Sequence, residues 1–190
     1  MYTEQQFNLP ELPGLSEEQV QIHLGLYAGY VKNTNALLEK VEAMKDGGDA
    51  YAMAEVQRRL EFEFDGMRMH EYYFEQLEGG AEAPAEDSNL VKYVTEQYGS
   101  FDAYLDDLRR IGSTRGIGWV VTYYDDKAQM FRNAWVGDHE FGQLAGLQIV
   151  FVVDMWEHAY MVDYRPATKG EYFDTYLALV NWSVVDARIS

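Results

Sequence analysis

"KDGGD", at residues 45–49, separates two long segments whose apolar residues recur at helical spacing. The first segment begins at Ser16, where SEEQ has the form of a capping box, and continues through Val41. The second runs from about Ala50 to Leu77 and ends at a pair of glycines. The sequence therefore predicts a long antiparallel helical hairpin over residues 16–78.

The stretch GGAEAPAED, at residues 79–87, marks a boundary after the hairpin. We expect an N-terminal α-hairpin domain over residues 1–84 and a C-terminal α/β domain over residues 85–190. A short helix is predicted at Asn89–Gln97 and another within SFDAYLDDLRRIG, residues 100–112.

Two β-rich runs flank a polar turn in residues 117–136, which predicts a β-hairpin. A third apolar run, LQIVFVVD at residues 147–154, is typical of a buried strand, and the chain after it is mostly helical and aromatic. The predicted fold class is α+β: a long antiparallel helical hairpin, followed by a C-terminal lobe with a small antiparallel three-stranded sheet and helices.

Composition limits the possible functions. The chain has 190 residues, of which 47% are hydrophobic, so it can bury a substantial core. Its formal net charge of −17 argues against nonspecific nucleic-acid binding, which depends on Lys and Arg neutralising phosphates. The lack of cysteine leaves His and carboxylate as the ligands expected in any metal site. Without a leader or a run of roughly 18 apolar residues, we expect a cytoplasmic protein with no nucleic-acid or membrane partner.

Two of the four histidines lie in the predicted hairpin. Residues equally far from its turn should lie level with one another, and the midpoint of positions 23 and 70 falls at 46–47, within KDGG. We therefore expect His23 and His70 to face each other. Both lie on segments with apolar faces, so two core histidines with local hydrogen bonds are the alternative to a pair of ligands.

The stretch VVDMWEHAYMVDY, at residues 152–164, places a carboxylate among apolar residues. An isolated carboxylate at Asp154 would be costly to bury, so it needs a hydrogen-bonding, cationic or metal partner. If the segment from Asp154 is helical, His158 lies four residues on along the same face, where imidazole and carboxylate can bind one cation. An ordinary hydrogen-bonded pair is the alternative.

DMWEHAY, at residues 154–160, matches the D-x-W-E-H-A-Y signature of the iron/manganese superoxide dismutases, and the chain resembles that family over most of its length. The segments that carry the rest of the resemblance are QIHLGLYAGYVKNTNALLE, FDGMRMHEYYFEQL, GSFDAYLDDLRR, GIGWVVTYYD and LVNWSVVDARI. The resemblance implies an oxidoreductase with an antioxidant role that converts superoxide to dioxygen and hydrogen peroxide.

The same resemblance implies a metal site with three histidines and one carboxylate, holding one iron or manganese ion per subunit, with iron slightly preferred. Zinc, which has no redox chemistry, could not serve. The implied ligands are His23, His70, Asp154 and His158.

Around that site, the resemblance assigns Tyr30 to the gateway tyrosine and proton network, with Trp119 and Trp156 as packing walls. A Gln or His in the family hydrogen-bonds the solvent on the metal. Gly66 cannot do so, and the resemblance assigns that part to His139, for whose ring Gly66 would leave room. The alternative for His139 is an exposed loop histidine.

Other implied features concern assembly. Glu157 corresponds to the glutamate that reaches the ligand histidine of the other subunit, so a homodimer, or a tetramer, is expected. The histidine usually found before the gateway tyrosine is missing, and Tyr27 is the nearest candidate replacement; its usual tyrosine partner is Met161 here. The stretch from His23 to the gateway tyrosine is one residue shorter than in relatives, which suggests that a π-bulge is absent.

The basic residue common near the family's first helix is also not evident, so attraction of an anion would rely on Lys32 or Arg165. Two other classes of function stay open: a metal-binding relative without turnover, and another mononuclear redox enzyme. Three histidines and an aspartate would leave the latter little room for an organic substrate.

Overall fold

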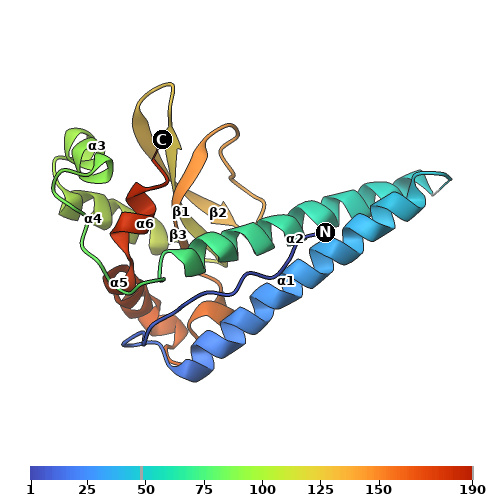
Figure 1. Cartoon of the computed structure of the whole chain (residues 1–190), viewed down its shortest axis with the longest axis horizontal. Coiled ribbons are helices and arrows are strands. Elements are labelled where there is room, and N and C mark those ends of the chain that lie inside the picture. The colour runs from blue at the N-terminus through green and yellow to red at the C-terminus, as the bar shows by residue number, and fades with distance from the viewer. Residues whose placement is uncertain (48, 190) are drawn as a thin grey trace.

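The computed structural model describes residues 1–47 and 49–189. Its first two helices, α1 (Glu17–Met44) and α2 (Ala50–Glu75), run antiparallel and form the predicted hairpin, whose tip projects from the rest of the molecule (Figure 1). Ser16 caps α1 by accepting a hydrogen bond from the backbone N–H of Gln19. Only this half of the predicted capping box forms, because the Gln19 side chain has other partners.

The hairpin buries side chains only near its base. In α1 the buried positions recur every three or four residues, and they are Gln19, His23, Tyr27, Val31 and Thr34. In α2 the buried positions begin at Glu63. The half of the hairpin that carries buried side chains therefore packs against the C-terminal lobe, where it can contribute to a site.

The C-terminal lobe begins with two short helices, α3 (Asn89–Tyr98) and α4 (Phe101–Gly112). A three-stranded antiparallel sheet follows, with strand order β2-β1-β3. Its strands are β1 (Gly118–Asp125), β2 (Met130–Gly137) and β3 (Gln148–Asp154). The predicted α+β fold class is confirmed.

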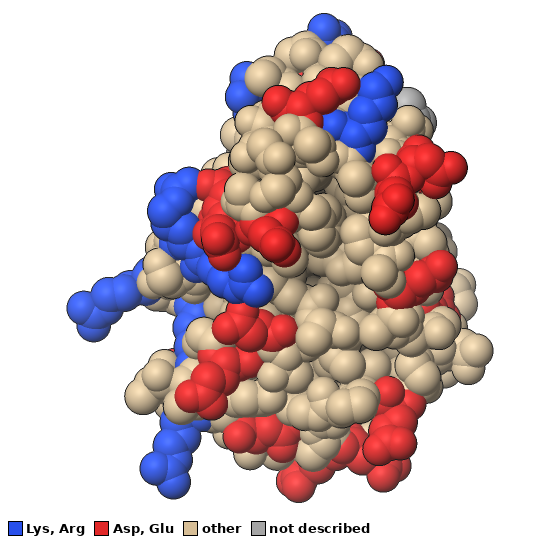
Figure 2. All heavy atoms as spheres, turned by 90° about the vertical axis from the view of Figure 1, so that its left-hand side faces the viewer, with Lys and Arg blue, Asp and Glu red and all other residues tan. Residues whose placement is uncertain are grey.

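After the sheet come the 3-10 turns η1 (Glu157–Ala159) and η2 (Pro166–Thr168), then α5 (Lys169–Leu179) and α6 (Trp182–Asp186). None of the described helices is long and apolar enough to cross a bilayer. Figure 2 shows that Asp and Glu are spread over the face on the left-hand side of Figure 1, whereas Lys and Arg lie along the left edge and at the top of the view.

The side chains of Gln76 and Arg188 tie the sheet to α2. The amide of Gln76, just beyond α2, donates to the carbonyl of Val152 at 2.7 Å and accepts from the N–H of Val152 at 3.1 Å. Gln76 thus takes the place of a neighbouring strand at the free edge of β3. This contact brings the end of β3 close to the buried half of the hairpin.

The structure corrects one premise about the segment from Asp154. Asp154 is the last residue of β3 and pairs with Trp119 of β1, so residues 154–158 do not form an α-helix. The strand continues to this point because its apolar, β-branched residues pack in the sheet. His158 follows in the single 3-10 turn η1, and the chain reversal rather than a helix face brings it back toward Asp154.

Candidate metal centre

Four side chains from separate elements converge beside the base of the hairpin. They are His23 of α1, His70 of α2, Asp154 of β3 and His158 of η1, and one ligand atom from each lies within 4.8 Å of all the others. The same carboxylate oxygen, Oδ2 of Asp154, lies 3.0 Å from Nε2 of His23, 3.1 Å from Nε2 of His158 and 3.5 Å from Nε2 of His70. Three imidazole nitrogens and one carboxylate oxygen could thus hold one metal ion.

His70 provides the test of that fit. Its Nδ1 donates to the backbone carbonyl of Gly66 at 2.6 Å, so in the neutral ring the lone pair lies on Nε2 and faces the cluster. This Nε2 is buried and has no hydrogen-bond partner among the described residues. A buried, unpaired acceptor costs about 1–3 kcal/mol, and a cation bound by Nε2 would remove that cost. The residues present therefore fit a metal.

The hairpin geometry agrees with the sequence prediction. The rings of His23 and His70 face each other with centroids 5.0 Å apart, and both are buried. Both Nε2 atoms point toward Asp154, and His70 also makes a local hydrogen bond from its Nδ1 to the carbonyl of Gly66.

The charge states suit a metal as well. Burial lowers the pKa of His23 and lowers the pKa of His70 further, so both rings are neutral near pH 7. Burial alone would raise the pKa of Asp154, but the interactions with His158 and His23 outweigh it and lower that pKa. Neutral imidazoles and an ionised carboxylate are the forms that bind metals.

His139 lies buried in the turn after β2, so the alternative of an exposed loop histidine is wrong. Trp119 Nε1 donates to its Nδ1 at 2.9 Å, which leaves the proton of the neutral ring on Nε2, 2.7 Å from the hydroxyl of Tyr30. Burial lowers the pKa of His139 to about 4, so the ring is neutral. A Cβ on Gly66 would lie 2.6 Å from Cδ1 of Tyr30 and 3.2 Å from Cδ2 of His139, so this glycine makes room for both rings.

Aromatic rings enclose the four candidate ligands. Trp119 lies edge-on to His70, with centroids 5.1 Å apart. Trp156 stacks on His139 at 4.7 Å and on His158 at 5.5 Å. Both tryptophans thus contact rings of the candidate site, and their role as its walls stays a prediction.

Phe62 was missed by sequence reasoning. Its ring lies 4.6 Å from that of His139 and 6.5 Å from that of Trp156. The signal was available, because Phe62, Gly66 and His70 follow one another at four-residue spacing along α2.

Gln19 is a second residue that sequence reasoning missed. Its buried side-chain amide donates to the carbonyl of His158 at 2.6 Å and accepts from the N–H of Val162 at 3.0 Å. Nearby, the backbone N–H of Ser16 donates to Asp163 at 2.6 Å. The first turn of α1 therefore holds the loop that carries His158. Gln19 and His158 are 139 residues apart, and no local sequence pattern predicts such a contact.

Tyr27 does not take the interfacial position that the sequence predicted for it. Tyr27 is buried, and its hydroxyl donates to Glu71 at 3.2 Å and accepts from the N–H of Gln5 at 2.9 Å. Burial raises the pKa of Tyr27 to about 12. Because its hydroxyl is used inside the chain, the prediction that Tyr27 replaces the interfacial histidine is wrong. Met161 is 47% exposed, and α1 is an uninterrupted α-helix.

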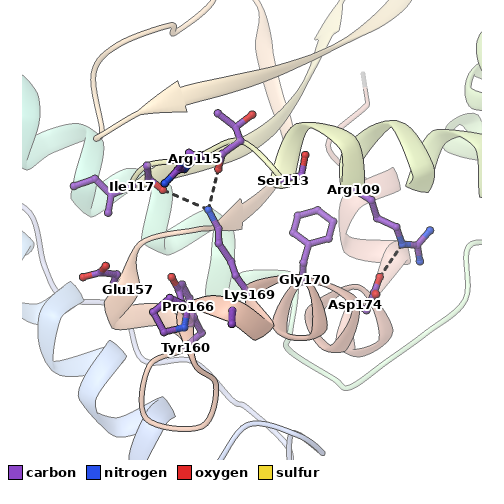
Figure 3. Close-up of a pocket in the computed structure, with 15 residues that line it drawn as sticks. Arg109, Ser113, Arg115, Ile117, Glu157, Tyr160, Pro166, Lys169, Gly170 and Asp174 are labelled. Carbon is purple, nitrogen blue, oxygen red and sulfur yellow. Dashed lines mark hydrogen bonds and ion pairs between the residues drawn. The ribbon is translucent and has the colours of Figure 1, made fainter.

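A cavity of about 640 Å³ opens beside the turn that carries His158. Figure 3 shows Glu157 and Tyr160 on one side of it, with Lys169 reaching across to the loop after α4. Lys169 Nζ donates to the carbonyls of Thr114 at 3.2 Å and Gly116 at 3.4 Å. Glu157 is exposed and has no ion-pair partner within residues 1–47 and 49–189, in contrast to the Arg109–Asp174 pair at the far end of the cavity.

Comparison with known proteins identifies the family. A family model described as "Iron/manganese superoxide dismutases, alpha-hairpin domain" matches residues 6–78, and one described as "Iron/manganese superoxide dismutases, C-terminal domain" matches residues 86–188. The domain boundary expected after residue 84 stays a prediction.

Curated relatives agree along nearly the whole chain. "Superoxide dismutase [Fe]" of Methanothermobacter marburgensis is 28% identical over 96% of this chain and 95% of its own length. "Superoxide dismutase [Fe]" of Tetrahymena pyriformis is 30% identical over 93% and 92%. "Superoxide dismutase [Mn]" of Haloarcula marismortui is 29% identical over 90% and 83%. This chain belongs to the iron/manganese superoxide dismutase family.

Proposed function

We propose that this protein is a superoxide dismutase that converts two superoxide ions and two protons to dioxygen and hydrogen peroxide at the site described above. The observation that carries the proposal is the convergence of three imidazole nitrogens on Oδ2 of Asp154, with Nε2 of His70 left unpaired. We assign His23, His70, Asp154 and His158 as the ligands of one iron or manganese ion, with iron slightly preferred since two of the three relatives above are named for it.

An iron or manganese ion held by these four side chains would supply the change between the 3+ and 2+ states that oxidation of one superoxide and reduction of the next require. The chain's own residues hold the ligands in place for this chemistry. Gly66 fixes the ring of His70 through its carbonyl, and the N–H of Trp156 donates to Oδ1 of Asp154 at 2.8 Å, which leaves Oδ2 facing the histidines.

Proton supply is assigned to His139 and Tyr30. Trp119 fixes the neutral tautomer of His139, whose Nε2–H donates to the Tyr30 hydroxyl. Burial, reinforced by the charge of Asp154, raises the pKa of Tyr30, so its hydroxyl keeps its proton at neutral pH. Because Tyr30 is half-buried, this pair links the buried site with solvent.

A homodimer, or a tetramer built from it, is part of the proposal. Its support is Glu157, an exposed carboxylate beside His158 that lacks an ion-pair partner within the described part of the chain. Exposed apolar side chains nearby, Met161 and Val162, are typical of a surface that another protein covers. A cytoplasmic location and an antioxidant role stay predictions.

The test is metal analysis together with a superoxide-consumption assay on one purified sample. We expect one iron or manganese per chain and rapid consumption of superoxide. Asp154→Ala or His158→Ala should lose both the metal and the activity while circular dichroism keeps its helical signal. Stoichiometric metal and full turnover in either variant would show that the ligands are misassigned, and a metal-loaded, inactive wild type would indicate a metal-binding relative without turnover.

A further inference from the structure

Most of the candidate site is buried, and its partly exposed side chains lie together. His23, His70, Asp154 and their neighbours Trp119 and His139 are buried. The half-buried exceptions form a chain of rings that we call the aromatic arc: Tyr30, Phe62, Trp156 and His158. Successive centroids along the arc lie 6.5, 6.5 and 5.5 Å apart. Solvent therefore comes nearest to the buried ligands at the arc.

One cation lies on the arc. The guanidinium carbon of Arg59 is 4.0 Å from the centroid of the Phe62 ring, a cation–π distance. Nη2 of Arg59 is 2.5 Å from Oε1 of Glu63, whose other carboxylate oxygen accepts from Asn33 at 3.2 Å. The α1 and α2 helices thus fix the guanidinium against the arc.

In the Arg59–Glu63 pair, the cation lies toward solvent and the carboxylate lies toward the protein interior. The Arg59 side chain is 49% exposed, whereas that of Glu63 is 4% exposed. An approaching anion therefore meets the positive group, with the carboxylate behind it. Burial dominates the lowered pKa of His139, and the charge of Arg59 adds to it, so this charge is felt inside the site as well.

A local cation matters for this protein because its formal net charge is −17. That charge opposes the approach of an anion, but the field at a narrow entrance is set by the charges close to it, since surface charges beyond about 10 Å are screened at 0.1 M salt. Lys32 and Arg165, the cations expected from the sequence, make no ring contact with the arc within the described residues.

We propose that Arg59, held against Phe62 by Glu63, attracts the anionic substrate to the aromatic arc. The proposal rests on the proposed function, and it deepens that function by naming the residue that guides the substrate. Arg59 does not touch the ligands, so its effect is on approach and binding of the anion and not on the electron transfer itself.

The experiment uses the metal-loaded protein and azide, a small anion that binds metals, as the probe. Arg59→Gln should weaken azide binding, measured by absorption titration, roughly two- to tenfold at an ionic strength of about 0.01 M. The difference should shrink at about 1 M salt, where the screening length is about 3 Å. Arg59→Lys, which keeps the charge, should restore most of the affinity, and pulse radiolysis should give the same order for the second-order rate constant with superoxide.

Arg58→Gln is the matched control, because it removes the same charge from the adjacent residue. Arg58 lies 3.1 Å from Glu55 and 3.9 Å from Glu140 and has no contact with the Phe62 ring. We expect its azide affinity to equal that of the wild type. An equal loss in Arg58→Gln, or wild-type affinity in Arg59→Gln at low salt, would overturn the proposal.

Loss of Arg59 could leave Glu63 buried without its cation and impair folding. The effect of Arg59→Gln is therefore also measured in a Glu63→Gln background, which lacks the carboxylate. Arg59→Gln/Glu63→Gln should bind azide more weakly than Glu63→Gln alone, and equal affinities would overturn the proposal. If the wild type holds metal and binds azide but consumes no superoxide, the proposed function fails, while the role of Arg59 is still decided by azide.

Discussion

The rings of Tyr30 and His139, the two residues assigned to proton supply, pack against Gly66. Its carbonyl accepts from His70, and a side chain in its place would collide with Tyr30 and crowd His139. Glycine within a helix costs about 1 kcal/mol relative to alanine. Glycine at position 66 thus lowers the helix propensity of α2 but lets the rings of Tyr30 and His139 pack against the helix backbone.

Gly66→Ala should therefore fail to stabilise the protein. The gain in helix propensity of about 1 kcal/mol is offset by overpacking, which costs about 1–3 kcal/mol. We expect the free energy of unfolding of the metal-free protein, measured in urea, to fall by about 1 kcal/mol. Gly29→Ala in α1 is the control, since a Cβ there meets nothing within 4 Å and should stabilise by about 0.4–1 kcal/mol. Equal stabilisation by both substitutions would contradict the packing described for Gly66.

At the scale of elements, the first turn of α1 is joined to the loop after β3. Ser16 caps the helix, and the Gln19 side chain bridges the carbonyl of His158 and the N–H of Val162. The helix that supplies His23 therefore also holds the turn that supplies His158. Two candidate ligands, far apart in the sequence, are fixed relative to each other by one side-chain amide.

Gln19→Met keeps the approximate shape of the side chain but removes both hydrogen bonds. Losing these two part-buried hydrogen bonds costs on the order of 1 kcal/mol each, and a looser His158 should release metal faster. The measurement is the rate of metal loss to a chelator, followed by elemental analysis. Gln21→Met, on the exposed side of α1, should behave as the wild type. Identical rates for Gln19→Met and the wild type would refute a positioning role for Gln19.

At the scale of the whole molecule, the fold buries neutral imidazoles within a strongly acidic protein. Burial lowers the pKa of His23, His70 and His139, the last to about 4, whereas the unfolded chain binds protons near pH 6.5. Stability from these groups is thus complete above about pH 6.5 and is lost as the pH falls toward 4. The stabilising pKa shift of Asp154 is lost only at lower pH.

The metal-free protein should accordingly lose stability between about pH 7 and pH 5. The share of His139 is on the order of 3 kcal/mol when the pH has reached 4, and His139→Gln should reduce the pH dependence by that share. Urea unfolding at several pH values measures both. An unfolding free energy that is the same at pH 7 and at pH 5 would show that these histidines are not buried in the neutral form.

Assembly also belongs to this scale. If Glu157 reaches the His158 of a second copy, Glu157→Ala should weaken the dimer, because removing one partner of a buried charged contact costs about 3–5 kcal/mol. Sedimentation velocity should show dissociation at concentrations where the wild type is dimeric. Glu96→Ala, an exposed glutamate on α3, is the control. An unchanged dimer with unchanged metal content would rule out the cross-subunit role.

The sequence by itself determined the helical hairpin and the fact that two candidate ligands on it, His23 and His70, face each other. Apolar spacing, the cap at Ser16 and the glycines between the two segments are local signals, so the hairpin and the facing of His23 and His70 could be predicted. The signature at residues 154–160 supplied the rest of the ligand set through resemblance.

Only the tertiary structure decided what surrounds those ligands. It placed Asp154 at a strand end, turned Tyr27 inward toward Glu71, joined Gln19 to His158 and set Arg59 over Phe62. The Gln19 and Tyr27 contacts join segments that are distant in the sequence, and which side chains meet there depends on how whole elements pack. Local periodicity carries no information about that packing, so these partners could not be predicted from the sequence.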